Sequence, residues 1–154
     1  MATQDELDRK FLDVAYEEAQ QGLSEGGIPI GSVLVRNGEI IGRGHNRRVQ
    51  KGDPILHGEM DAIQNAGRQK TYRDVTCYTT LSPCMMCAGT VVQFGVKRVV
   101  IGEARNFPGN PDFLRAHGVE VVILDDDGCI ELMLRFIREK PELWDEDIAG
   151  RNEV

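Results

Sequence analysis

Hydrophobic residues near the start of the chain recur at the spacing of one helix face, at Leu7, Phe11, Val14 and Ala15. We expect this helix to run from about Asp5 to Gln21 and to end at Gly26-Gly27. The run from Ile30 to Val35 and the shorter run from Glu39 to Ile41 then flank Asn37-Gly38. Because Asn-Gly between two such runs is typical of a β-hairpin turn, the pattern predicts two antiparallel strands.

Short β-rich runs alternate with helical patterns through the rest of the chain. The expected strands are Val75 to Thr80, Arg98 to Ile101 and Val119 to Leu124. The expected helices are Pro54 to Gly67, Cys84 to Phe94, Asp112 to His117 and Asp127 to Glu139, the last ended by Pro141. This alternation favours an α/β fold, a layered sheet with helices on both faces, in which the last two strands run parallel. Without repeats, low-complexity tracts or linkers, residues 1–154 are expected to form a single domain.

The composition is that of an ordinary globular domain, with 41% hydrophobic and 28% charged residues in a chain of 154. A chain of this length can bury a sizeable core. No apolar run approaches the ~20 residues that a membrane span needs. The N-terminus from Met1 to Glu6 is polar and acidic, without the basic and then apolar regions of a signal peptide. We therefore expect a cytoplasmic protein with no membrane partner.

The net charge bears on nucleic-acid binding, and the cysteine content bears on disulfides. The formal net charge is −7, and basic clusters such as Arg47-Arg48 and Lys97-Arg98 are too short to form the basic stripe of a nucleic-acid-binding protein. Nucleic acid is therefore disfavoured as a partner. In the reducing cytosol the four cysteines are expected to stay as thiols. We interpret Cys77 and Cys129 as small buried hydrophobic residues.

Two short segments can together supply the ligands of one metal ion. His57-Gly58-Glu59 offers an imidazole, and Pro83-Cys84-Met85-Met86-Cys87 offers two thiolates on one face of a predicted helix, at whose N-terminus thiol pKa values fall. Such ligands favour zinc. Structural zinc sites are closed by four protein ligands, whereas catalytic sites keep one position for water. His57, Cys84 and Cys87 are therefore predicted to bind one Zn²⁺ per chain, with a catalytic water as the fourth ligand.

Glu59 lies beside these ligands without an obvious place among them. Zinc lowers the pKa of bound water from 15.7 to about 7, and a neighbouring carboxylate can take its proton. We expect Glu59 to pass this proton to a ring nitrogen of the substrate and later to protonate the departing amine. A redox pair of thiols would leave His57 and Glu59 unexplained, and a structural zinc site would need Cys77, which lies in a predicted strand. The pattern H-x-E followed by P-C-x-x-C resembles that of zinc-dependent nucleobase deaminases.

Motifs along nearly the whole chain resemble fungal-type cytosine deaminase, of the cytidine deaminase superfamily. The matching segments are Gly26–Gly31, Gly42–Asn46, Leu56–Glu59, Tyr78–Cys84 and Trp144–Ile148. The resemblance implies a three-layer α/β/α sandwich with a mixed five-stranded sheet, and a homodimer. It also implies a small-molecule nucleobase substrate. The implied reaction is the zinc-dependent hydrolytic deamination of free cytosine to uracil and ammonia.

The same resemblance assigns roles around the substrate ring. Asn46 is expected to bind the carbonyl and ring edge, and Asp147 the exocyclic amine, while Phe107 and Trp144 stack on the ring or close over it. The remaining substrate-binding positions are Ile30, Gly58, Leu81 and Ser82, with Ile148 in a C-terminal lid. Three of these residues have simpler interpretations: Asn46 in a turn, Trp144 in the core and Asp147 in a solvated acidic tail.

The substrate is less closely defined than the chemistry, because the loop from Asn106 to Leu114 departs from the family pattern. Other amino-heterocycles, such as isocytosine, guanine or a creatinine-like ring, therefore stay open. The wobble adenosine of tRNA is a further alternative, against which the acidic net charge weighs. Gly58 and the segment from Trp144 to Ile148 favour a free base, since a closed lid leaves little room for a ribose.

Overall fold

The computed structural model describes residues 1–150, and the last four residues of the expected domain, 151–154, lie outside the described residues. Five strands form one sheet in the order β2-β1-β3-β4-β5. In chain order they are β1 (Gly31–Arg36), β2 (Glu39–His45), β3 (Val75–Leu81), β4 (Arg98–Glu103) and β5 (Glu120–Ile123). β1 is antiparallel to β2 and β3, whereas β3, β4 and β5 are parallel. The expected hairpin, the parallel pair and the mixed five-stranded sheet are confirmed.

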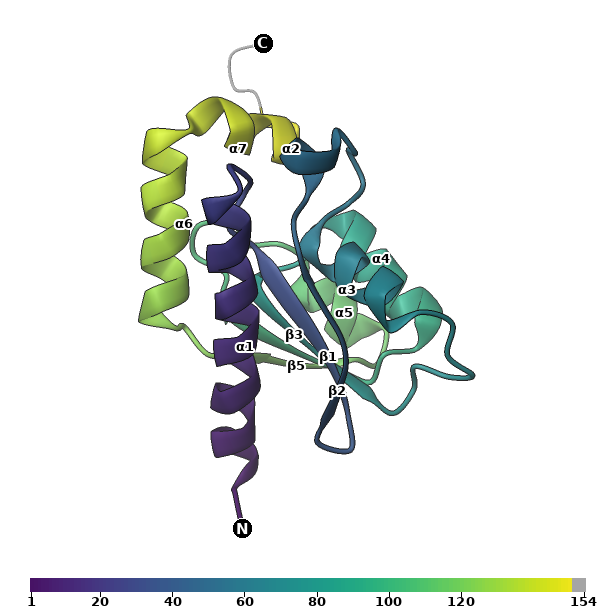
Figure 1. The fold of residues 1–154 in the computed structure, drawn as a ribbon. Helices are drawn as coiled ribbons and strands as arrows, with labels where there is room; N and C mark the ends of the chain where they lie inside the picture. The colour runs from purple at the N-terminus through teal and green to yellow at the C-terminus, as the bar shows by residue number, and fades with distance from the viewer. Residues whose placement is uncertain (151–154) are drawn as a thin grey trace.

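Helices cover both faces of this sheet. In the described part of the chain they are α1 (Gln4–Ser24), α2 (Arg48–Lys51), α3 (Gly58–Ala66), α4 (Met85–Phe94), α5 (Pro111–Ala116), α6 (Asp127–Glu139) and α7 (Pro141–Ile148). α1 and α6 lie on one face, and α3, α4 and α5 on the other, which makes the three-layer sandwich (Figure 1). None of the helices within residues 1–150 is long and apolar enough to span a membrane.

The two layers of core follow from alternation along the strands, because successive side chains point to opposite faces of a sheet. One cluster combines strand residues with α3, α4 and α5, including Leu34, Cys77, Val99, Ala62, Val91 and Leu114. The other combines the alternate strand positions with α1 and α6, including Val33, Tyr78, Val100, Phe11, Leu12 and Cys129. Cys77 and Cys129 are thus buried hydrophobic residues, as predicted.

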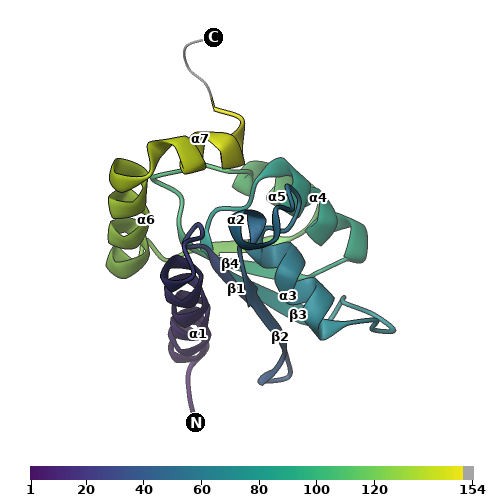
Figure 2. The same ribbon diagram turned by 45° about the horizontal axis from the view of Figure 1, so that its top comes forward.

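A third hydrophobic cluster lies at the end of the sheet and fixes α7 there. It contains Ile28, Ile30, Leu81, Met133, Phe136 and Trp144. α7 leaves the end of α6 and crosses toward α2 (Figure 2), where Glu146 contacts Arg48 at 3.3 Å. The segment interpreted as an acidic tail is therefore a helix. Pro141 ends α6 and also begins α7, since proline tolerates the first turn of a helix, where no N–H partner is needed.

Helix boundaries differ from expectation at α1, α2 and α3, and a side-chain cap accounts for the start of α1. Thr3 begins α1 with a capping box: its hydroxyl accepts from the N–H of Glu6, and its own N–H donates to the Glu6 carboxylate. The helix then continues past Gln21 to Ser24. The helix expected from Pro54 begins only at Gly58, and α2 was not predicted.

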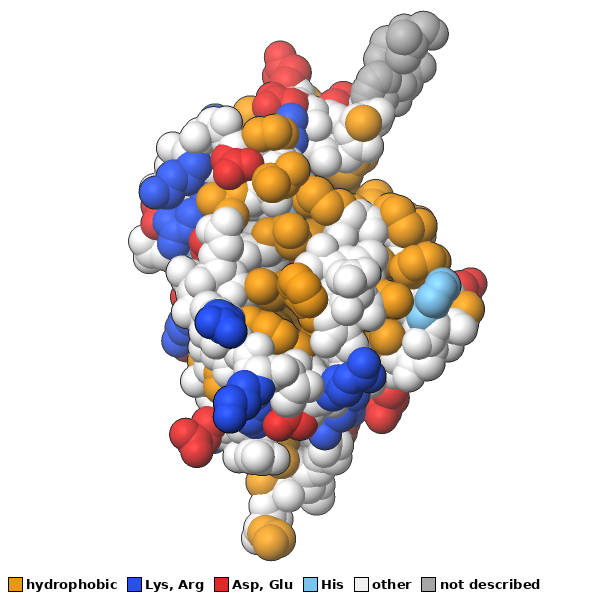
Figure 3. All heavy atoms as spheres, turned by 90° about the vertical axis from the view of Figure 1, so that its right-hand side faces the viewer, with side chains coloured by type: hydrophobic (Ala, Val, Ile, Leu, Met, Phe, Trp, Pro, Cys, Tyr) orange, Lys and Arg blue, Asp and Glu red, His pale blue; other side chains and the backbone are white. Residues whose placement is uncertain are grey.

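Part of the outer surface of α4 is hydrophobic. Hydrophobic side chains gather on the face that looks to the right in Figure 1 and toward the viewer in Figure 3. The exposed large hydrophobic residues of the described chain include Ile55, before α3, and Met85 and Phe94, on α4.

Candidate metal and catalytic site

The first residues of α3 and α4 bring the predicted ligands together. His57 precedes α3 and Cys84 precedes α4, both with extended backbone, and Cys87 lies in the first turn of α4. Neither His57 nor Cys84 caps its helix through the side chain, so both side chains are free to converge. Their approach follows from the sheet, because β3 leads directly to Cys84 and the segment after β2 leads to His57.

The geometry of the three ligand atoms fits zinc. Nδ1 of His57 lies 3.5 Å from Sγ of Cys84 and 3.8 Å from Sγ of Cys87, and all three atoms lie within 4.8 Å of one another. Tetrahedral zinc with ordinary bond lengths separates its sulfur and nitrogen ligands by about 3.6 Å. Nδ1 is therefore the nitrogen placed to bind metal. Cys77 is not part of this cluster and instead contacts the Ser32 hydroxyl at 3.6 Å.

The two thiols differ in acidity. The hydrogen bond with Cys87 lowers the pKa of Cys84 to about 4, and His57 adds to this effect against the opposing effect of burial. The same thiol pair, together with burial, raises the pKa of Cys87 well above its ordinary value. The Cys84 thiolate therefore holds the proton shared by the pair on Cys87.

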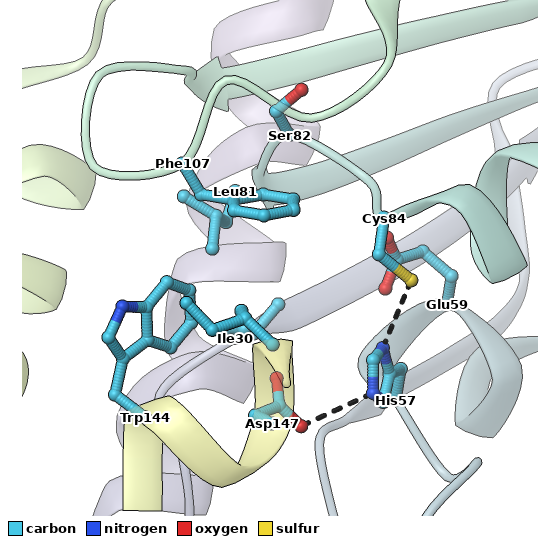
Figure 4. Close-up of a pocket in the computed structure, with 10 residues that line it drawn as sticks. Ile30, His57, Glu59, Leu81, Ser82, Cys84, Phe107, Trp144 and Asp147 are labelled. Atoms are coloured by element: carbon cyan, nitrogen blue, oxygen red, sulfur yellow. Dashed lines mark hydrogen bonds and ion pairs between the residues drawn. The ribbon is translucent and has the colours of Figure 1, made fainter. Parts of the chain in front are cut away.

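Glu59 turns back toward the ligands from the first turn of α3 (Figure 4). It is only 4% exposed. Burial, reinforced by the nearby Cys84, raises the pKa of Glu59 to about 7. A carboxyl group that titrates near neutral pH can both take and give a proton under physiological conditions.

Asp147 from α7 contacts the other ring nitrogen of His57. Its Oδ1 lies 3.2 Å from Nε2, and the side chain is 3% exposed (Figure 4). Such a partner keeps the proton on Nε2 and leaves Nδ1 for a metal. Sequence reasoning missed this contact, since no local pattern links a residue of the C-terminal segment to one before α3. The only available signal was an aspartate close to the hydrophobic residues Trp144 and Ile148.

A pocket of about 300 Å³ opens beside these residues. It is lined by Ile30, His57, Glu59, Leu81, Ser82, Cys84, Phe107, Trp144, Asp147 and Ile148 (Figure 4). The rings of Phe107 and Trp144 meet edge to face, with centroids 6.0 Å apart and planes at 89°. Trp144 is both a core residue and a wall of the pocket, so its two interpretations are compatible.

Asn46 and Gly58 lie next to residues that line the pocket, Asp147 and Ile30 respectively. Asn46 is buried; its Oδ1 accepts from the N–H of Arg48, and its Nδ2 donates to Oδ1 of Asp147 at 3.3 Å. It therefore stabilises a turn and also contacts a pocket residue. At Gly58 an added Cβ would lie 3.1 Å from the carbonyl oxygen of Ile30, so glycine lets α3 begin close to the pocket.

The loop after β4, which carries Phe107, is fixed by buried polar groups. The Glu103 carboxylate accepts from the N–H groups of Arg105 and Asn106 and from the Asn106 side chain. The Ser82 hydroxyl donates to the carbonyl oxygen of Pro108 at 2.8 Å. The side chain of Ser82, one of the predicted substrate-binding residues, is thus engaged with the loop.

Comparison with known proteins identifies the family. The family model of the cytidine and deoxycytidylate deaminase zinc-binding region matches residues 5–103. The chain belongs to this deaminase family. Cytosine deaminase of Candida albicans is 56% identical over 145 residues, covering 92% of this chain and 97% of the relative. A tRNA-specific adenosine deaminase of Streptococcus pyogenes is 36% identical over 145 residues, covering 86% of this chain and 91% of the relative.

The solved structures agree with this assignment. A structure from a study of tRNA wobble-position adenosine deaminases superposes with a TM-score of 0.70 at 26% identity, covering 80% of this chain and 99% of that chain. The expected fold, the zinc cofactor and the class of zinc-dependent aminohydrolase are confirmed. His57, Glu59, Cys84 and Cys87 all lie inside the segment matched to the deaminase family, whereas the residues of α7 follow it.

Proposed function

We propose that this deaminase converts free cytosine to uracil and ammonia. The closure of the pocket by α7 carries the proposal, because Trp144, Asp147 and Ile148 all line the pocket beside the zinc ligands. The pocket is small, which favours a single ring over a nucleoside. The similarity to the Candida albicans cytosine deaminase over 92% of this chain supports the same substrate.

Glu59 is the proposed proton carrier. Bound zinc would supply a water acidic enough to attack carbon at neutral pH. Glu59 takes a first proton from this water and gives it to the ring nitrogen next to the reacting carbon. It then takes the second proton from the new hydroxyl group on that carbon and gives it to the amine, which leaves as ammonia. Its pKa of about 7 suits each transfer, since neither protonation state is strongly favoured.

The proposed ring contacts surround this carboxyl group. Phe107 and Trp144 provide flat surfaces for the ring, and Asp147 accepts from the exocyclic amine. Asn46, beside Asp147, binds the carbonyl and ring edge. The rest of the site comprises the hydrophobic side chains of Ile30 and Leu81 and the main-chain groups of Gly58, Ser82 and Cys84.

A second candidate is deamination of adenosine in tRNA, which the Streptococcus pyogenes relative favours. The net charge of −7 weighs against it, because a protein that binds an RNA backbone normally presents basic residues. The loop with Phe107, which departs from the family pattern, forms part of the pocket, so other amino-heterocycles are tested beside cytosine.

Ammonia release by the zinc-loaded protein tests these candidates, with cytosine, cytidine, guanine, isocytosine and tRNA supplied separately. We expect turnover of cytosine alone, and no turnover of cytosine by the zinc-loaded protein would overturn the substrate. Glu59→Ala is expected to keep its zinc and to lose nearly all turnover. Substantial activity in that variant would overturn the role of Glu59.

We also propose that the protein is a cytoplasmic homodimer. Met85 and Phe94, at the two ends of α4, are exposed hydrophobic residues that a second copy would cover, and none of the four cysteines is in a disulfide, which suits a reducing compartment. Light scattering should give twice the chain mass of 17.2 kDa, and Phe94→Asp should lower it toward one chain. A monomer in the unaltered protein would contradict the dimer, and exclusion from the cytosol after cell fractionation would contradict the location.

A further inference from the structure

His45 lies at the end of β2, and no step of the proposed chemistry uses it. Its side chain is 3% exposed and packs against Gly22 of α1, where an added Cβ would lie 3.1 Å from the ring. Nδ1 lies 2.7 Å from Oε1 of Glu18, and Nε2 lies 2.9 Å from Oε1 of Glu25. Both ring nitrogens therefore face a carboxylate, Glu18 on one side and Glu25 on the other.

Charged side chains surround His45 on several sides. Three carboxylates and two guanidiniums surround the ring and its main chain: Glu18, Glu25, Asp61, Arg43 and Arg47. Glu17 also reaches Arg43, but its side chain is 66% exposed and therefore screened by water. Glu18, Glu25 and Asp61 are the less exposed carboxylates, and two of them, Glu18 and Glu25, contact the ring directly.

This cluster fixes the main chain on both sides of Asn46. Gln50 donates to the Glu25 carboxylate at 3.1 Å and to the carbonyl oxygen of Asn46 at 3.2 Å, which links the His45 ring through Glu25 back to Asn46. Oδ2 of Asp61 accepts from the N–H of His45 at 3.0 Å and from Nε of Arg47 at 2.9 Å. The two chain neighbours of Asn46 are thereby fixed to α3, the helix that carries Glu59.

We propose that His45, held between Glu18 and Glu25, is a positioning residue that fixes Asn46 for its contact with the substrate ring. The inference rests on the role of Asn46 in the proposed function. Because His45 acts through Asn46, its loss weakens binding of the ring and leaves proton transfer by Glu59 intact.

His45→Gln removes the ring that contacts both carboxylates while keeping a polar side chain of similar reach. We expect the KM for cytosine to rise about tenfold, the effect of losing roughly one hydrogen bond, with kcat and zinc content close to those of the unaltered protein. His117→Gln is the matched control, since the same substitution is made at an exposed histidine at the end of α5. It is expected to change neither constant.

A double-mutant cycle separates positioning from general stability. Asn46→Ala and the double variant His45→Gln/Asn46→Ala are expected to have the same KM, because His45 has nothing left to position. Additive effects on KM, or a fall in kcat with KM unchanged, would overturn the proposal. If His45→Gln does not fold, Glu25→Gln replaces it, because Glu25 is a more exposed partner of the same ring. This variant is also expected to raise the KM for cytosine.

The side-chain amide signals of Asn46 in ¹⁵N NMR spectra make the test independent of turnover. They should shift in His45→Gln and not in His117→Gln, whichever substrate the protein uses. Unmoved Asn46 signals in His45→Gln would overturn the positioning role. Absence of cytosine turnover in the unaltered protein would overturn only the proposed function.

Discussion

Replacing Asp147 by asparagine tests whether the C-terminal helix helps to hold the metal. In the unaltered protein Oδ1 of Asp147 lies 3.2 Å from Nε2 of His57, while Nδ1 of the same ring faces both thiols. A carboxylate in this position orients the ring and makes the ligating nitrogen more basic. Asparagine can still accept from Nε2, but through a neutral oxygen, and a hydrogen bond without the charge is roughly half as strong.

The burial of both groups sets the expected size of the effect. The loss of a partner that supports a metal ligand typically lowers metal affinity by roughly 10- to 100-fold. The side chains of Asp147 and His57 are 3% and 12% exposed, so water screens their contact little. We therefore expect a loss of zinc affinity of roughly 30- to 100-fold, or about 2 to 3 kcal/mol.

Competition with a chromophoric chelator at fixed pH measures this zinc affinity directly. Glu146→Gln is the matched control, because it neutralises the neighbouring carboxylate on α7, whose side chain is 53% exposed and pairs with Arg48. The control is expected to bind zinc as tightly as the unaltered protein. Equal affinity in Asp147→Asn would refute the inference that α7 supports the metal site, whatever happened to turnover.

Three further substitutions test the fold and the pocket. Arg98 and Tyr78 donate to Asp8 and lower its pKa against the effect of burial. The ionised Asp8 therefore stabilises the fold fully above its unfolded pKa of about 4, and this stabilisation is lost as pH falls through the lower folded pKa. Asp8→Asn should therefore lower the free energy of unfolding by about 2 kcal/mol at pH 7 and by less at pH 3, measured with urea; a pH-independent difference would argue against this. Gly31→Ala should destabilise the protein by about 3 kcal/mol in thermal melts, since an added Cβ would overlap the main chain of α1, and an unchanged melting temperature would contradict that packing. Trp144→Ala should raise the KM for cytosine and make α7 more sensitive to proteolysis while zinc stays bound, and unaltered kinetics would remove Trp144 from the proposed ring contacts.

Hydrophobic patterning predicts most of this fold because the elements have regular buried faces. The helix expected from Asp127 to Glu139 has those bounds in the structure, and the strand expected from Val75 to Thr80 is longer by one residue. β2 shows where patterning fails. Its second half contains Gly42 and Gly44, which have low strand propensity, yet it pairs with β1 and continues to His45. Added Cβ atoms at these glycines would meet Ala62 of α3 at 2.5 and 2.7 Å, so close helix packing requires them.

The metal ligands could be predicted because their chemistry and local spacing are both visible in the sequence. Contacts between distant segments could not be predicted in this way. Phe107 and Trp144 were expected near the ring only through a resemblance, and the edge-to-face contact between them depends on how α7 crosses the end of the sheet. Asp147 resembled a residue of a solvated acidic tail because its partners, His57 and Asn46, belong to other parts of the chain.

The zinc-site residues and the residues proposed to contact the substrate lie in different parts of the chain, and Asp147 contacts a member of each group. The ligands and Glu59 lie in the segment from 5 to 103 that matches the deaminase family, whereas Phe107 and α7, which close the pocket, follow it. Asp147 contacts His57 on one side and Asn46 on the other. A change in α7 that moves Asp147 therefore acts on the zinc ligand and on a proposed ring-binding residue together. For this reason, variants of α7 selected for a new base should be assayed for zinc affinity as well as for turnover, since an apparent change of substrate can arise from a weakened metal site.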